Sequence, residues 1–284
     1  MRIVRHPINE ELAKTLFHEE RERLLPLLEC ARKATRALSP LVTNARIMYQ
    51  TGGVVAPHTS EVGYALRLSA QANTAILVFS HNQRPPQSFL LGNGPPVSYS
   101  EPVDESHAHV GRWIDALELA TITRQTDLLT TLKRLPNELL ERSSTVGARS
   151  TYLFVSLLRT LGARDPIIGH PAFNVYQEYC ANCHDDSAHC IAIRHLAIPF
   201  LGILRQLECA DAAAFSNSLV GALEMHKKYW GSSEKRRKDF DGFVSLQLTA
   251  VAALAWDRGL RFDVESDYIP TSWVRGELFS HGSS

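Results

Sequence analysis

His226-Lys-Lys-Tyr229-Trp230 opens the stretch of sequence that decides the fold, and this stretch continues to Pro270. After a polar segment comes Asp-Gly-Phe at 241–243, and an apolar run then leads to Trp-Asp-Arg-Gly at 256–259. The run is apolar on nearly every side of a helix, which is typical of a helix at the centre of a core. The stretch therefore predicts a helical protein built around a buried C-terminal helix.

Helical spacing recurs along most of the chain. Apolar residues repeat every three or four positions, which predicts further helices, at 10–38, 61–79, 113–124, 144–161, 173–183, 188–207 and 212–230. Asn9 is expected to cap the first of these, Pro26 to kink or divide it, and Ser39-Pro40 to end it. Gly162 is expected to end the helix from 144. We predict a mostly α fold, a multi-helix globular domain.

Residues 81–110 differ from the rest because they are rich in proline. Asn93-Gly94, a dipeptide that favours hairpin turns, separates two short apolar runs. This predicts a small β-hairpin around residues 87–101, with a longer loop as the alternative because Pro-Pro follows the turn. We treat residues 1–284 as one domain with an N-terminal helical layer (1–80), this excursion (81–110) and a C-terminal helical layer (111–284). The prolines are Pro85, Pro86, Pro95, Pro96 and Pro102.

Composition narrows the class of protein. The chain has 284 residues, 44% of them hydrophobic, and a formal net charge of zero. A zero balance provides no overall field that would attract nucleic acid or an anionic membrane. No apolar run reaches the roughly 18–20 residues of a membrane span, and the N-terminus lacks a secretory signal. With an odd number of cysteines, we expect a cytoplasmic protein with reduced thiols.

One short segment contains candidate metal ligands. Cys180-Ala-Asn-Cys183-His184 matches the attachment pattern of c-type haem, but that attachment requires export. Thiolates and imidazoles also suit zinc, as a small structural clip. The alternative is a helix end with ordinary buried thiols and a polar loop. We expect no cofactor and no metal, and the weak candidates for zinc are Cys180, Cys183, His189 and Cys190.

Three charged or titratable features of the C-terminal stretch have both a functional and a structural interpretation. His226 lies on the apolar stripe of its helix with Trp230, where a histidine is usually a core residue. The basic run 235–238 could meet phosphates, but no aromatic residues alternate with it, which favours a solvated loop. Asp257 also falls on an apolar stripe, so it should be paired, with Arg258, Arg261 or His226 as the partner.

An acidic strip follows. Asp263, Glu265 and Asp267 alternate with other residues, and an extended backbone would put these three carboxylates on one face. The strip is either a solvated edge or a surface that meets a basic partner. Trp273, close behind it, is a second candidate contact because aromatic residues often dominate binding energy.

Motifs of common enzyme classes are missing from the sequence. There is no Gly-x-Ser-x-Gly, no Gly-x-Gly-x-x-Gly after a strand, no P-loop and no His-Glu-x-x-His. We therefore expect a protein that is not an enzyme.

The C-terminal motifs resemble those of the immunity protein 49 family of bacterial polymorphic toxin systems. That family carries a His-x-x-Tyr-Trp-like motif, a Gly-Phe opening to an apolar helix, an Asp-Arg-Gly exit and a Glu-Ser-Asp-Tyr-hydrophobic-Pro segment, in this order. The rest of the chain matches more loosely, including the helix at 113–124. The matching residues are His226, Tyr229, Trp230, Gly242, Phe243, Asp257, Arg258, Gly259, Glu265, Ser266, Asp267, Tyr268 and Pro270.

The resemblance implies a cytoplasmic immunity protein for interbacterial competition. Such a protein binds the toxin domain encoded by a neighbouring gene and neutralises it by occluding its active site. Most motif residues read as core and capping residues, so the Pro-rich excursion 81–110 is a candidate for the variable binding surface. Two alternatives stay open: a metal-dependent hydrolase or enzymatic antidote that uses Cys180–Cys190, and a helical scaffold or regulatory binding protein.

Overall fold

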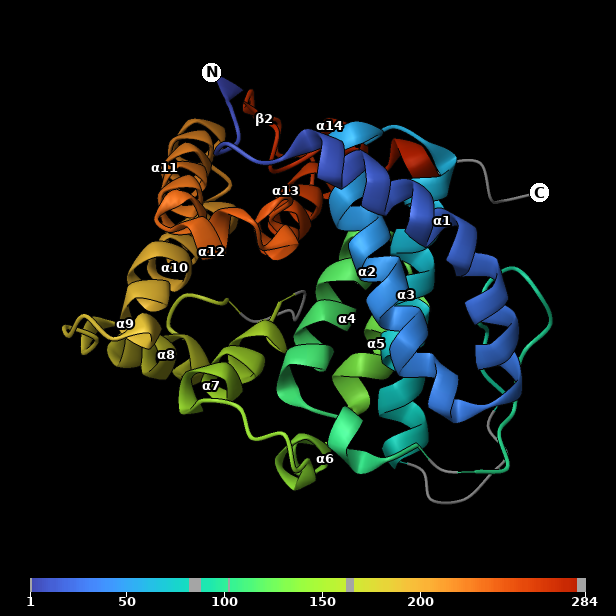
Figure 1. Ribbon diagram of the computed structural model, residues 1–284. Coiled ribbons are helices and arrows are strands. Elements are labelled where there is room, and N and C mark those ends of the chain that lie inside the picture. The colour runs from blue at the N-terminus through green and yellow to red at the C-terminus, as the bar shows by residue number, and fades with distance from the viewer. Residues whose placement is uncertain (1, 82–87, 102, 162–165, 280–284) are drawn as a thin grey trace. The chain divides into compact units, whose positions relative to one another are not determined.

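The computed structural model describes residues 2–81, 88–101, 103–161 and 166–279, and the chain is mostly helical as predicted (Figure 1). It divides into two compact units. Unit 1 contains residues 1–9 and 148–275, and unit 2 contains residues 10–147 and 276–284. Each unit therefore includes a short segment from the opposite end of the chain. The division falls after Gly147, beyond the Pro-rich excursion, which belongs to unit 2.

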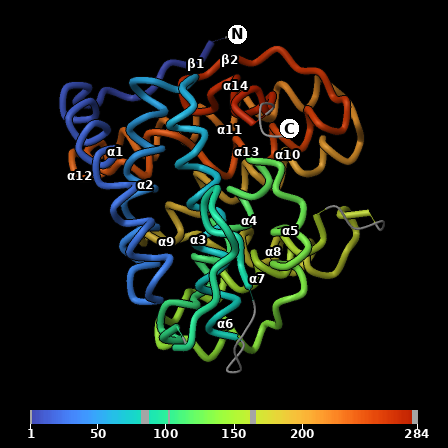
Figure 2. The backbone as a smooth tube through the Cα atoms, turned by 90° about the vertical axis from the view of Figure 1, so that its right-hand side faces the viewer, coloured from blue at the N-terminus to red at the C-terminus, as the bar shows by residue number. Residues whose placement is uncertain are grey.

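The helices α1 to α4 of unit 2 pack side by side in chain order (Figure 2). The third is buried along almost its whole length and forms the centre of this unit. Trp113 of the fourth is fully buried, and its Nε1 donates to the carbonyl of Leu132 at 2.9 Å. The elements of unit 2 are α1 Glu10–Lys33, η1 Thr35–Ala37, α2 Leu38–Val55, α3 Ser60–His81, η2 Glu105–His107, α4 Val110–Ile122, α5 Thr126–Arg134, α6 Asn137–Arg142 and η5 Glu277–Phe279.

The boundary between α1 and α2 corrects the sequence prediction. α1 contains Pro26 without being divided and ends at Lys33, so the expected end near Ser39-Pro40 was wrong. Pro40 instead lies in the first turn of α2, where a missing N–H costs no helical hydrogen bond. α2 was not predicted at all. Its Gly52 lies so close to α3 that a Cβ there would be 2.4 Å from Cγ2 of Val62.

The Pro-rich excursion is fastened to α1. Phe89 and Val97 form an isolated antiparallel bridge, and each N–H donates to the other's carbonyl at 2.8 Å. The predicted hairpin is present as this single bridge. The guanidinium of Arg32 donates to the carbonyls of Leu91 and Pro95 at 2.6 and 2.7 Å. The described part of the excursion is thus anchored by polar contacts to a long helix.

Some residues named in the sequence analysis lie outside the described residues. They are Pro85, Pro86, Pro102 and Gly162.

Unit 1 is helical apart from one small sheet. β1 (Arg2–Ile3) pairs in parallel with β2 (Glu265–Ser266), and Arg2 lies opposite Glu265. The sequence analysis did not predict this pairing. The helix around Phe243–Asp257 was predicted, and most of its residues are buried. The helices of unit 1 are α7 Arg149–Leu158, α8 Pro171–Ala181, α9 Ala188–Ala192, the π turn η3 Ile193–Ala197, α10 Ile198–Cys209, α11 Ala212–Gly231, α12 Glu234–Arg237, η4 Phe240–Gly242, α13 Leu246–Asp257 and α14 Thr271–Val274.

α9, η3 and α10 continue into one another as a helical stretch of 22 residues, Ala188–Cys209. By length and composition alone this stretch could cross a membrane, which the sequence analysis did not expect of any segment. A core helix of a soluble protein meets the same two criteria, so the evidence for a span is weak. Pro199 cannot donate to the carbonyl of His195, and the π turn directly precedes it.

We predict that Gly52→Ala destabilises unit 2. The added methyl would overlap Val62, and forcing extra volume into a packed contact costs about 1–3 kcal/mol. Urea unfolding measures this change. Gly221→Ala in α11 is the control, since a Cβ there meets nothing within 4 Å and alanine favours the helix by about 0.5–1 kcal/mol. Equal stability of the two variants would contradict the close approach of α2 to α3.

Candidate functional site

The C-terminal motif forms a packed cluster in unit 1. His226 is 5% exposed, and its Nε2 lies 3.4 Å from the carbonyl oxygen of Gly242. The ring of Tyr268 meets the imidazole edge-on at a centroid distance of 4.7 Å. A Cβ on Gly242 would lie 2.5 Å from the indole of Trp230, so this position requires glycine. His226 and Gly242 are therefore buried and Trp230 is half-buried against them, which agrees with the structural interpretation of His226.

The N-terminal segment completes this cluster. The backbone N–H of His6 donates to the hydroxyl of Tyr268 at 2.8 Å, and His6 Nδ1 lies at the same distance from that hydroxyl. Arg5 Nε donates to the carbonyl of Phe243 at 2.8 Å, and its guanidinium also donates to the carbonyl of Asp267. The sequence analysis missed these N-terminal residues. No local pattern could have found them, because His6 and Tyr268 lie 262 positions apart.

Burial controls the protonation of the cluster. It lowers the pKa of His226 to about 3. The pKa of His6 is lowered to about 4, first by burial and then by the positive charge of Arg5. Burial also raises the pKa of Tyr268 to about 12. Near neutral pH both imidazoles are uncharged, which suits residues that pack and is unfavourable for binding an anion.

The three carboxylates of the acidic strip do not lie on one face in the structure. Asp267 is partly buried and accepts from the backbone N–H of Arg5 at 3.1 Å and from Arg2 Nη2 at 3.3 Å. The turn after β2 therefore directs this carboxylate toward the N-terminal segment. The predicted common face of all three carboxylates is wrong in this respect.

Asp263 and Glu265 do share a face, because Val264 between them is buried and both carboxylates are exposed. We refer to these two residues as the acidic pair. Their side chains form no hydrogen bond or ion pair with any residue in the part of the chain that the structure describes. They line a small pocket together with Trp256 and Arg275.

Trp273, the other residue predicted to contact a partner, is fully buried in α14. Its side chain fills the core of unit 1 and is not available to a partner in this structure. The expectation that it forms a surface contact was wrong.

The exit from α13 follows the capping pattern of a helix that ends in glycine. Gly259 has a φ of +83°, which favours glycine, and the N–H of Leu260 donates to the carbonyl of Ala255 at 3.0 Å. Asp257 is exposed at the helix end, so its expected place on the buried stripe was wrong. Arg261, one of its predicted partners, donates instead to the carbonyl of Trp256 at 2.7 Å.

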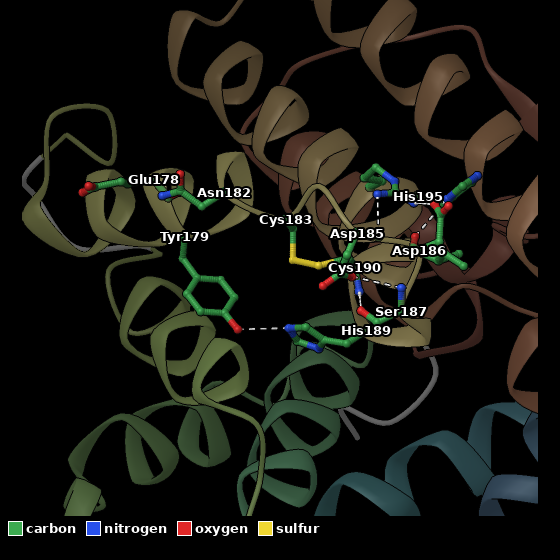
Figure 3. The surroundings of a disulfide bond; sticks show 12 residues. Glu178, Tyr179, Asn182, Cys183, Asp185, Asp186, Ser187, His189, Cys190 and His195 are labelled. Atoms are coloured by element: carbon green, nitrogen blue, oxygen red, sulfur yellow. Dashed lines mark hydrogen bonds and ion pairs between the residues drawn. A yellow bond between two sulfur atoms is a disulfide. The ribbon is translucent and has the colours of Figure 1, made fainter.

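The cysteine-rich segment contains a disulfide (Figure 3). Cys183, in the loop that follows α8, is joined to Cys190 in α9, with the two Cα atoms 5.1 Å apart. The expectation of reduced thiols is therefore wrong for this pair. Cys180 is a buried free thiol, and burial raises its pKa to about 11. His189, the remaining zinc candidate, pairs through Nε2 with the hydroxyl of Tyr179 at 3.0 Å.

These contacts bear on the zinc alternative. Two of the thiols it requires are bonded to each other, and the third is held protonated near neutral pH. Among residues 2–81, 88–101, 103–161 and 166–279, no group of three or more His, Cys, Asp or Glu side chains is placed to hold a metal ion.

The basic run 235–238 forms part of a short helix and not the solvated loop we expected. Ser233 caps α12 by accepting from the N–H of Arg236 at 3.2 Å, and the Arg236 guanidinium lies 4.1 Å from the centroid of the Tyr229 ring. Lys238 pairs with Glu234 at 2.6 Å. Tyr229, a motif residue, thus supports α12 by a cation–π contact.

The fold and the cluster together define a class of protein. This is a mostly helical protein whose C-terminal motif builds a core and fastens the N-terminal segment to it. A family model described as Immunity protein 49 matches residues 56–273, and the chain belongs to that family. Membership indicates an immunity protein and suggests a non-enzymatic role. No curated protein and no solved structure matches the chain.

We predict that stability falls as the pH is lowered below about 6.5. Above that pH, His6 and His226 are neutral in both the folded and unfolded states. Below it the unfolded chain binds protons that the folded chain excludes, down to the folded pKa values of about 4 and 3. In this pH range each histidine lowers the free energy of unfolding by up to about 1.4 kcal/mol per pH unit. Urea unfolding between pH 7.5 and 5 measures the slope.

The control for this prediction replaces one histidine at a time. His226→Phe should reduce the slope, and His184→Phe, at an exposed position of the same unit, should leave it unchanged. Identical slopes in both variants would contradict the assignment to the buried cluster.

We predict that the disulfide stabilises unit 1 by about 2 kcal/mol. This value is at the low end of the usual range because the loop that the disulfide closes has only a few residues. Reductant should lower the urea midpoint of the wild type and leave a Cys183→Ser/Cys190→Ser variant unaffected. Cys209→Ser, at an exposed free cysteine, should behave like the wild type. A wild-type midpoint that does not respond to reductant would mean that the two thiols are unpaired in solution.

Proposed function

We propose that this protein neutralises a bacterial toxin by binding it stoichiometrically and occluding its active site. Membership of the immunity protein 49 family supports the part of this proposal that makes the protein an immunity protein. The observation that carries the mechanism is the acidic pair, Asp263 and Glu265. These carboxylates are exposed, form no ion pair with another residue of the described ranges, and lie on a short extended segment that β1 supports.

The acidic pair suits a basic partner. Exposed charges of one sign speed the encounter with a surface of the opposite sign and disfavour wrong partners. An acidic surface is a suitable way to cover an active site that is itself basic. We propose that the partner is the toxin domain encoded by a neighbouring gene, and that the two proteins meet in the cytoplasm during interbacterial competition.

The two alternatives from the sequence have less support. A hydrolase that uses the segment 180–190 would need thiolates, and Cys183 and Cys190 are joined in a disulfide. A scaffold that meets nucleic acid through the basic run would need cations free to reach phosphates, and Arg236 and Lys238 already contact Tyr229 and Glu234. Neither alternative has an observation in its favour that the binding function lacks.

The first test is co-expression with the neighbouring toxin domain. We expect restored growth and a stoichiometric complex on size exclusion. Rescue by substoichiometric immunity protein, with no complex, would contradict occlusion and indicate an antidote that acts by turnover.

The second test concerns the acidic pair. Asp263→Lys/Glu265→Lys should lower the association rate, and the loss should be largest at low salt. The double variant should also raise Kd by about tenfold, which corresponds to ~1.4 kcal/mol. Stopped-flow or interferometry at several salt concentrations measures both quantities. Glu178→Lys/Glu224→Lys is the matched control, with the same change of charge at exposed positions of unit 1. Equal effects of the two double variants would contradict a specific role of the acidic pair.

A further inference from the structure

Unit 2 contains a groove of about 410 Å³ between the helices α1 and α3. Leu25 and Arg21 of α1 lie on one side, and Tyr64 and Arg67 of α3 lie on the other. Leu278 of the C-terminal segment closes one end. We call this feature the α1–α3 groove. Its volume lies within the range of pockets that take a large side chain or a small ligand.

The walls of the α1–α3 groove are preformed. Leu278 packs directly on Gly63, where a Cβ would lie 3.1 Å from the leucine Cβ. Arg67 Nη2 donates to the carbonyl of Phe279 at 2.9 Å, and its guanidinium lies 5.4 Å from the centroid of that ring. The C-terminal segment is thus fixed against α3. A rigid groove loses little conformational entropy when it is filled, which favours tight binding.

The chemistry of the groove is an apolar base with a cationic rim. Leu24 and Met48 are buried beneath it, whereas the side chain of Leu25 is 61% exposed. Arg21 is exposed and forms no ion pair with a residue of the described ranges. Glu61 also lines the groove, so Arg21 and Arg67 leave one positive charge in excess. An apolar centre within a polar rim is the usual arrangement at the anchor point of a protein interface.

The acidic pair alone does not account for tight binding. Exposed charges contribute mainly to encounter rate and specificity, whereas tight complexes depend on a few apolar anchors that are shielded from water. Occlusion of a toxin requires such an anchor. The groove also takes one wall from α1, which precedes the family-matched residues 56–273. A surface that distinguishes one toxin from another is expected to include parts outside the shared pattern.

We propose that the α1–α3 groove receives an apolar anchor side chain of the toxin, followed in the toxin chain by a carboxylate that pairs with Arg21. The anchor covers Leu25 and is of leucine or phenylalanine size. This inference rests on the proposed function and adds a second contact surface, on unit 2, to the acidic pair of unit 1.

The test uses the full-length protein and an inactive variant of the neighbouring toxin domain. Leu25→Arg fills the groove with a charged side chain and should raise Kd by about tenfold or more in calorimetry. Arg21→Glu should do so as well, and more strongly at low salt. The matched controls are on the same helix: Leu12→Arg, at a leucine that is 48% exposed outside the groove, and Lys33→Glu. Circular dichroism and thermal unfolding establish that each variant is folded.

Each outcome decides the proposal. A loss of affinity in Leu25→Arg and Arg21→Glu, with both controls unchanged, supports it. Wild-type affinity in the folded groove variants overturns the inference and leaves the proposed function intact. A wild type that binds no toxin overturns the proposed function and the groove's occupant together.

If Leu25→Arg proves unfolded, Leu25→Ala gives the same decision with a smaller change in side-chain size. If light scattering finds a wild-type dimer that Leu25→Arg converts to a monomer, a second copy occupies the groove and the proposal is overturned.

Discussion

The hydrogen bonds that join His6 to Tyr268 are the constraint on which unit 1 depends. Together with the pairing of β1 and β2, they hold the first residues of the chain against the segment that follows α13. Ser245, which caps α13, donates its N–H to the carbonyl of Tyr268 at 2.9 Å. The same tyrosine therefore orients the N-terminal segment and the start of the central helix. Since residues 276–279 belong to unit 2, neither unit is complete without a segment from the opposite end of the chain.

This constraint explains why the residues of the C-terminal motif are mostly buried or fixed by close contacts. His226 and Tyr268 are buried, Gly242 is required by the indole of Trp230, and Gly259 ends α13 in a conformation that favours glycine. Such residues specify a fold. They leave the choice of partner to exposed residues.

The sequence was a good guide to local structure and a poor guide to contacts between distant parts of the chain. Helical spacing predicted the core helix of each unit, but α2 was missed because Ser39-Pro40 was taken as the end of a helix. Pro40 is harmless in a first turn, and Gly52 is needed for the approach to α3. Alternation placed Asp263 and Glu265 correctly. It failed for Asp267, whose partners Arg2 and Arg5 lie at the other end of the chain.

The two proposed contact surfaces would act on different steps of one association. The acidic pair is exposed and would act mainly on the encounter, where its effect weakens as salt screens it. The α1–α3 groove would act after the encounter, because an apolar side chain that is buried there must be returned to water before the complex dissociates. Affinity among related complexes differs mostly through dissociation. Substitutions in the groove should therefore act mainly on the dissociation rate, and substitutions of the acidic pair mainly on the association rate.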